Sequence, residues 1–209
     1  MADLEFFFDP VCPWAWITSR WVDEVRSQRD YEVSWKFISL KLLNEGNEGI
    51  PPFFVEAQRF GHGSLRVASA ARAAEGNAAV DRFYTAVGTA LHADGRAQEA
   101  IADRAAFLAG VLRDAGLSER LGEAFDDTAH DEVIRFETQT ALDRVGTGVG
   151  TPILTFHPRT DRAASVFGPV VSRTPRGEEA VRLWDAVEVI AGSGVSEIKR
   201  TLRAEPRFD

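Results

Sequence analysis

The segment Leu4-Glu5-Phe6-Phe7-Phe8-Asp9-Pro10-Val11-Cys12-Pro13-Trp14-Ala15-Trp16 decides the fold class of this chain. Its apolar run, residues 4–8, predicts a buried strand that Asp9-Pro10 ends. Pro13 suits the first position of a helix, because the N–H that proline lacks would have no partner there. An apolar stripe at four-residue spacing extends this helix to Ser27; it consists of Ile17, Trp21 and Val25. The segment therefore predicts a buried strand followed at once by a helix.

Strand patterns recur on either side of a long middle region. Alternating apolar and polar residues over 31–37 predict a second strand, so the first three elements form a β-α-β unit with a parallel pair. Residues 153–157 and 164–167 predict two further strands, residues 178–191 a closing helix, and residues 196–204 a short last helix. The β-α-β plus β-β-α order predicts an α/β chain with the thioredoxin fold.

The middle region has a different character. Residues 51–145 are alanine-rich and show helical periodicity throughout. We therefore expect a thioredoxin-fold domain of residues 1–50 and 146–209, with an inserted helical subdomain of residues 51–145 between the second and third strands.

Composition limits the partners of the chain. It has 209 residues, a formal net charge of -8 and a pI of about 5.1, which argues against nucleic acid and against an anionic membrane surface. Acids stand at the N-terminus where a signal peptide would be positively charged, and no apolar run approaches the ~18 residues of a membrane span. We therefore expect a cytoplasmic protein.

The single cysteine, Cys12, is the main candidate for chemistry. It lies where the first strand meets the first helix, and the free N–H groups and dipole of a helix N-terminus stabilise a thiolate. Lone cysteines are more often small buried hydrophobes, but the flanking Pro13 and Trp14 favour a nucleophile here. No glycine-rich phosphate loop follows a strand, and His62, His92, His130 and His157 are scattered, so we expect no nucleotide, flavin or metal site.

The pair Thr151-Pro152 is a second candidate feature, at the start of the third predicted strand. In a thioredoxin-type site a cis proline lies against the catalytic cysteine, and the backbone before it pairs with a bound thiol. An ordinary trans proline opening an edge strand fits the spacing equally well, so the residues leave both possibilities open.

Two long motifs resemble those of a known family. Residues 8–21, Phe-Asp-Pro-Val-Cys-Pro-Trp-Ala-Trp-Ile-Thr-Ser-Arg-Trp, and residues 167–185 with the closing Glu205-Pro206-Arg207-Phe208-Asp209 resemble the DsbA-like branch of the thioredoxin superfamily. The chain is most similar to the actinobacterial mycothiol-dependent nitroreductases, over essentially its whole length. The resemblance implies thiol chemistry with a low-molecular-weight thiol, here mycothiol, and reduction of disulfides or nitro compounds.

The resemblance also implies a set of site residues. Cys12 matches the attacking cysteine. Pro13, Trp14 and Ala15 belong to the same motif, Thr151 and Pro152 to the loop before the third strand, and Asn44 and His92 fall where the family has polar residues facing the cleft. His92 could equally cap the end of a helix, and His62, between two glycines, is expected in a mobile loop.

Ala15 departs from the family pattern, because the family has a second cysteine at this position. A dithiol enzyme uses that cysteine to resolve its mixed disulfide. The chain is therefore a natural monothiol form, an engineered trapping variant, or a lineage without redox chemistry; the retained Cys12 favours the first two.

Three functions compete at this point. A monothiol oxidoreductase would form a mixed disulfide on Cys12 with a small disulfide or electrophile as its other substrate. A kappa-type glutathione transferase or isomerase would bind its thiol without forming a disulfide, and typically has serine at this position. A redox-inactive binding module would have an unreactive Cys12. The sequence allows a monomer or a homodimer.

Overall fold

The computed structural model describes residues 2–208, and the chain divides into two compact units. One unit contains the residues before Asp9, Pro13–Lys36 and the residues from Ala141 onward; the other contains Asp9–Cys12 and Phe37–Thr140. The elements follow in the order β1 (Leu4–Phe8), α1 (Pro13–Arg26), β2 (Val33–Phe37), α2 (Leu40–Leu43), α3 (Pro52–Glu75), α4 (Asn77–Gly88), the π-helix η1 (Thr89–Ala93), α5 (Ala97–Ala102), α6 (Arg104–Asp114), the 3-10 helices η2 (Glu119–Asp126) and η3 (Thr128–His130), α7 (Asp131–Val145), β3 (Ile153–Phe156), β4 (Ala164–Phe167) and α8 (Gly177–Ala191).

Within residues 2–208, the first unit contains a four-stranded sheet with the strand order β2-β1-β3-β4. β3 runs antiparallel to both β1 and β4, with Leu154 opposite Phe6 on one side and opposite Val166 on the other. Every residue of β1 is buried. This is expected of a central strand whose sheet is covered on both faces, and it explains why the sequence of β1 is a nearly continuous apolar run.

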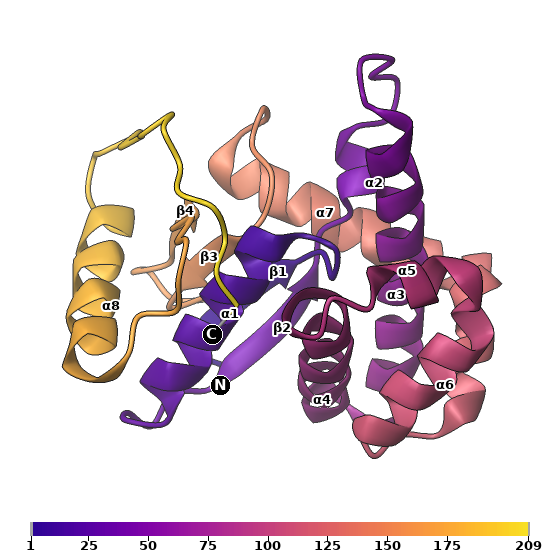
Figure 1. The fold of residues 1–209 in the computed structure, drawn as a ribbon. Coiled ribbons are helices and arrows are strands. Elements are labelled where there is room, and N and C mark those ends of the chain that lie inside the picture. The colour runs from indigo at the N-terminus through magenta and orange to yellow at the C-terminus, as the bar shows by residue number, and fades with distance from the viewer. Residues whose placement is uncertain (1, 209) are drawn as a thin grey trace. The chain divides into compact units, whose positions relative to one another are not determined.

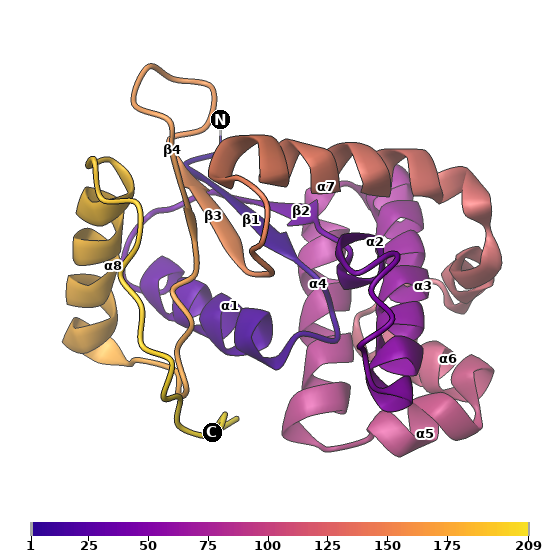
Figure 2. The same ribbon diagram turned by 90° about the horizontal axis from the view of Figure 1, so that it is seen from above.

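Helices α1 and α8 lie side by side on one face of the sheet (Figures 1 and 2). The ring of Trp184 on α8 lies 5.3 Å from that of Trp21 on α1 and 5.2 Å from that of Phe156 on β3. The indole N–H of Trp21 also donates to the carbonyl of Ala180 at 2.9 Å. The apolar stripes of both helices thus meet in one aromatic cluster, which fixes α1 on the sheet.

The end of α7 contacts the other face of the sheet. Arg144 Nη1 lies 2.6 Å from Glu5 Oε2 and 2.9 Å from Thr155 Oγ1. Glu5 and Thr155 are opposite one another in the β1–β3 register, and alternate residues of a strand point to opposite faces. Glu5 and Thr155 therefore lie on the face of the sheet opposite to Trp184, and Arg144 contacts both of them.

The second unit is helical and is organised around α3. Its Phe60 ring lies 5.9 Å from the ring of Phe107 on α6 and 5.6 Å from that of Phe125 in η2. Further side chains of this unit are fully buried, among them Leu65, Val67, Val80, Phe83, Val87, Val111, Leu112 and Ile134. Each helix contributes the apolar stripe that its sequence shows, so the unit has a core of its own.

Two sequence expectations need correction. Residues 196–204 form no helix; they are an exposed segment without regular structure, because no apolar stripe there finds a partner. His62 lies inside α3 and is 3% exposed rather than in a mobile loop. The inserted subdomain of residues 51–145 stays a prediction; the helical unit of the structure, defined by compactness, contains Asp9–Cys12 and Phe37–Thr140.

None of the helices described within residues 2–208 has the length and apolar character required to cross a membrane.

Candidate active site

The residues before Cys12 form a tight turn. The backbone N–H of Cys12 donates to the carbonyl of Asp9 at 3.0 Å, and Asp9 Oδ1 accepts from the N–H of Val11 at 3.1 Å. Aspartate at the first position and proline at the second are the preferred residues of such a turn, since the carboxylate binds the backbone two residues on and proline presets φ. The sequence Asp-Pro-Val-Cys therefore specifies the local structure that carries the thiol.

The second oxygen of Asp9 ties this turn to α2. Asp9 Oδ2 accepts the N–H of Leu40 at 2.8 Å, and Leu40 is the first residue of α2. Asp9 itself is completely buried. Burial raises the pKa of its carboxyl to about 7, although the two backbone donors oppose the shift. The turn thus contains a carboxyl group that titrates near neutral pH.

A glycine of α3 permits this burial. A Cβ atom at Gly61 would overlap Asp9 Oδ1 and would come within 2.9 Å of Val11 Cγ2. Two residues on, a Cβ at Gly63 would overlap the Phe125 ring. A glycine inside a helical pattern often marks a close approach of this kind, and this signal could have placed His62, between the two glycines, in a packed helix.

His92 contacts the same turn from the π-helix η1. Its Nε2 lies 2.9 Å from the carbonyl oxygen of Pro10. A carbonyl only accepts, so Nε2 carries the proton in this contact. Burial lowers the pKa of His92, with the Pro10 carbonyl acting in the opposite direction, so the imidazole is neutral near pH 7. His92 therefore holds the turn and does not simply cap its helix.

Cys12 is buried, with 6% of its surface exposed. It immediately precedes Pro13, the first residue of α1, as the sequence predicted. In the helical unit, the structure places Cys12, Asp9 and His92 on or against one four-residue turn. Asp9 escaped notice in the sequence because its role depends on Leu40, which is 31 residues away along the chain.

Asn44, by contrast, has local contacts. Its side-chain Nδ2 donates to the carbonyl of Leu40 at 2.9 Å, and its backbone N–H donates to the same oxygen at 3.1 Å. Asn44 thus ends α2, the helix that binds Asp9. Its predicted role in thiol binding stays a prediction.

The remaining predicted site residues belong to the sheet unit. Pro13, Trp14 and Ala15 form the first turn of α1, and Ala15 is fully buried. The guanidinium of Arg203, from the C-terminal segment, lies 5.8 Å from the Trp14 ring centroid. At the start of β3, the Thr151–Pro152 peptide bond is cis, and the Thr151 hydroxyl donates to the carbonyl of Phe7 at 2.9 Å.

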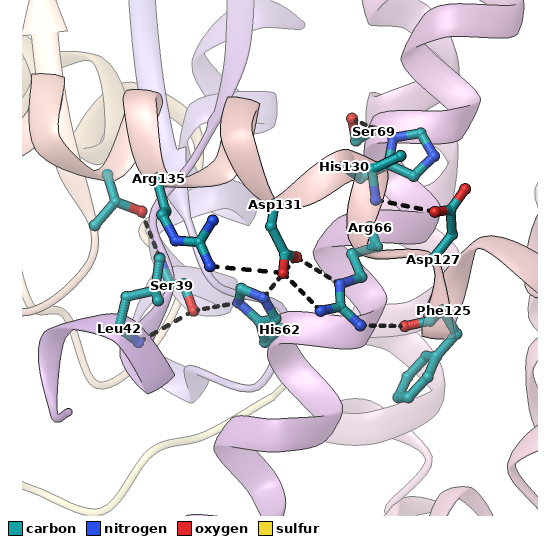
Figure 3. A network of polar contacts seen from close by, with 12 residues as sticks. Ser39, Leu42, His62, Arg66, Ser69, Phe125, Asp127, His130, Asp131 and Arg135 are labelled. Atoms are coloured by element: carbon teal, nitrogen blue, oxygen red, sulfur yellow. Dashed lines mark hydrogen bonds and ion pairs between the residues drawn. The ribbon is translucent and has the colours of Figure 1, made fainter.

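A buried polar network links the start of α2 to α3 and α7 (Figure 3). Ser39 caps α2 by accepting the N–H of Leu42 at 3.4 Å, and its hydroxyl lies 2.9 Å from His62 Nδ1. On the other side of the ring, His62 Nε2 lies 3.0 Å from Asp131 Oδ1. The order serine, histidine, aspartate is that of a hydrolase triad, but Ser39 is completely buried, so its hydroxyl acts as a helix cap.

Asp131 is the centre of this network. Arg66 binds it with two nitrogens, Nε at 2.6 Å from Oδ1 and Nη2 at 2.8 Å from Oδ2. Arg66, followed by His62, lowers the pKa of Asp131 to about 2. Burial lowers the pKa of His62. Around neutral pH the network therefore holds an ionised aspartate, a charged arginine and a neutral histidine that donates from Nε2.

Within residues 2–208, no group of three or more histidine, cysteine, aspartate or glutamate side chains could hold a metal ion.

The comparison with known proteins decides the family. Residues 11–200 match the sequence model of the Rv2466c-like family, which is described as mycothiol-dependent nitroreductase Rv2466c. The chain belongs to this family. A relative from Mycobacterium tuberculosis, the uncharacterized protein Rv2286c, is 33% identical over 196 residues, which cover 92% of this chain and 78% of that protein. The resemblance inferred from the two sequence motifs is confirmed.

Solved structures confirm the fold. The cytosolic disulfide reductase DsbM from Pseudomonas aeruginosa, solved with GSH, superposes with a TM-score of 0.58 at 16% identity over 88% of this chain and 98% of its own. A putative protein disulfide isomerase from Nitrosomonas europaea gives 0.57 at 16% identity, over 89% and 96%. The predicted α/β thioredoxin fold of the DsbA-like type is therefore correct. Together with the family, it makes the chain a thiol oxidoreductase.

The buried carboxyl of Asp9 should leave a signature in the pH dependence of stability. Its pKa is raised from the ordinary value of 3.8 to about 7 in the folded chain. At pH values between these two, the folded state therefore holds a proton that the unfolded state has lost. The contribution of Asp9 to stability is therefore greatest on the acid side and falls as the pH rises towards 7, by at most about 4 kcal/mol. We expect Asp9→Asn to remove this fall.

Urea unfolding of both proteins from pH 4 to pH 8 measures the effect. The difference in unfolding free energy between Asp9→Asn and the unmodified chain isolates the contribution of Asp9. His62 and His92 are present in both proteins, and their lowered pKa values reduce stability as the pH falls below about 6.5. A difference that does not change with pH would contradict the prediction.

Proposed function

We propose that this enzyme is a monothiol oxidoreductase that works through a mixed disulfide between Cys12 and a low-molecular-weight thiol. The observation that carries the proposal is the placement of a lone cysteine in a specified turn directly before α1, with alanine at position 15. The first amides of a helix can stabilise a thiolate at that position, and a neutral thiol would be a weak nucleophile.

The proposed cycle has two exchange steps. The Cys12 thiolate attacks one sulfur of a small disulfide, forms the Cys12–S–S–R bond, and releases the other half as a thiolate. A second small thiolate then attacks the R sulfur, which regenerates Cys12 and releases a new disulfide. With a nitro compound as acceptor, each two-electron reduction would oxidise two thiols to one disulfide. The second thiol takes the part that a cysteine at position 15 would play.

Mycothiol is the thiol that we propose, because the family is described by its dependence on it. The GSH in the DsbM structure makes glutathione the natural comparison. Cys12 is 6% exposed, which favours a small thiol over a protein disulfide because a bulky partner would reach the sulfur less easily.

The test is to incubate the reduced enzyme with oxidised mycothiol, or with oxidised glutathione, and to measure its intact mass after acid quenching. We expect one adduct per chain, reversed by the corresponding thiol and absent from Cys12→Ser. Disulfide reduction at the expense of the small thiol should fall at least a thousandfold in that variant, because the variant lacks the attacking sulfur. Failure of the unmodified chain to form an adduct, or equal turnover by Cys12→Ser, would overturn the proposal.

A further inference from the structure

Asp9 differs from the other buried carboxylates in its surroundings. Among the described residues, the remaining buried acidic side chains each have an arginine partner: Glu5 pairs with Arg144, Asp131 with Arg66 and Glu137 with Arg72. Asp9 is the most deeply buried of the four. Within residues 2–208 it is bound by two backbone N–H groups and by no charged side chain.

The turn and its link to α2 use both carboxyl oxygens of Asp9. An asparagine or serine side chain has one acceptor oxygen, so it could form the turn but could not give separate oxygens to Val11 and Leu40. The two contacts do not require a negative charge, because a protonated carboxyl keeps acceptor capacity, and an unpaired buried charge is expensive. The carboxyl therefore has a structural part in the turn, and the gain or loss of its proton can have a second role.

The position of Asp9 indicates that role. Its own carbonyl accepts the N–H of Cys12, Oδ1 binds the next N–H in the turn, and Oδ2 joins the turn to α2. The α2 end of this connection is fixed in turn by the Ser39 cap and by His62. The carboxyl of Asp9 and the N–H of Cys12 thus belong to one hydrogen-bonded turn, so a change in the charge of Asp9 acts on the residue that carries the thiol.

We infer that Asp9 is a positioning residue for the reaction at Cys12, and that its protonation and the ionisation of the Cys12 thiol are coupled. The inference rests on the proposed thiol chemistry. Two negative charges in one turn disfavour each other, so the thiolate forms most readily while Asp9 holds its proton. Binding or loss of that proton near neutral pH then changes the rate of thiolate attack.

The other titratable groups around the turn do not replace Asp9 in this role. At the points where neighbouring elements contact it, α2 carries Lys41, α3 carries His62 and η1 carries His92. Lys41 is exposed. The pKa values of both histidines are lowered from 6.5, chiefly by burial, so both are mainly neutral at pH 7 and above.

The rate of Cys12 alkylation by iodoacetamide between pH 5 and pH 10 tests the inference. We expect two inflections for the unmodified chain and one for Asp9→Asn. If the thiol pKa of the variant is lower by about one unit, its inflection should lie about one pH unit lower, and it should react up to about tenfold faster at pH values below both inflections. Asp127→Asn is a matched control, because Asp127 Oδ1 also accepts the N–H two residues on, from Ala129 at 2.9 Å, but is exposed. Its profile should equal that of the unmodified chain.

A second measurement decides the matter if Asp9→Asn does not fold. The infrared C=O band of the protonated Asp9 carboxyl can be followed against pH in the unmodified chain and in Cys12→Ser. Coupling is reciprocal, so ionisation of the thiol should split the titration of this band into two phases in the unmodified chain. Only one phase should remain in Cys12→Ser. Identical titrations in the two proteins, or identical alkylation profiles with and without Asp9, would overturn the inference. Neither result bears on adduct formation by Cys12, which tests the proposed function separately.

Discussion

Ala15→Cys is expected to shorten the lifetime of the Cys12 mixed disulfide at least a hundredfold. The substitution creates the two-cysteine motif that the resemblance to DsbA-like proteins implies. A thiol in the same chain attacks without the encounter of a second molecule, and well-oriented intramolecular reactions reach effective concentrations far above that of a dissolved small thiol. The unmodified enzyme should therefore accumulate its adduct, whereas the variant should convert it to an internal disulfide.

The experiment charges each protein with oxidised thiol, removes the excess, and follows the intact mass with time. Ala15 is fully buried, so added volume could disturb α1 by itself. Ala15→Ser is the matched control, because serine adds an atom at the same place without a thiol. We expect its adduct to last as long as that of the unmodified chain. Equal lifetimes in all three proteins would mean that position 15 has no part in resolving the adduct.

Asp131→Ala should lower the free energy of unfolding by about 3–5 kcal/mol, the range found when one partner of a buried ion pair is removed. The side chains of Asp131 and Arg66 are 10% and 14% exposed. Without the carboxylate, the guanidinium keeps the Phe125 carbonyl at 3.1 Å, and His62 Nε2 loses its acceptor. The Ser39 hydroxyl, which caps α2, contacts Nδ1 on the other side of the His62 ring.

Urea unfolding at pH 7 measures this loss. The matched control is Asp126→Ala, which removes an aspartate that lies 2.7 Å from Arg104 but is 69% exposed. An exposed pair contributes about 0.2–1 kcal/mol, so the control should be several-fold less destabilising. Similar losses for the two variants would show that burial of the network contributes little. Because the pKa of Asp131 is lowered to about 2, its stabilisation should persist at pH 5 and be lost as the pH falls from 4 towards 2.

The fold could be predicted from local patterns, and the site only in part. The run before Asp9, the proline after Cys12 and the alternating strands each determine their own element, and all are present in the structure. The Asp9–Leu40 and His92–Pro10 contacts join residues 31 and 82 positions apart. No periodicity encodes such pairs, because they depend on how helices pack in three dimensions. His62 was misplaced because glycine on both sides is typical of loops as well as of tightly packed helices.

The π-helix that presents His92 has an evolutionary consequence. Asp94 N donates to Thr89 O, five residues back rather than four, so this turn holds one residue more than an α-helix would. A single-codon deletion at Ala90 would restore the α-helical register and turn His92 by about 100° around the helix axis, away from Pro10. Among homologues, the length of this segment should therefore vary together with the identity of residue 92. A lineage that lost the extra residue would have to hold its cysteine turn by some other means.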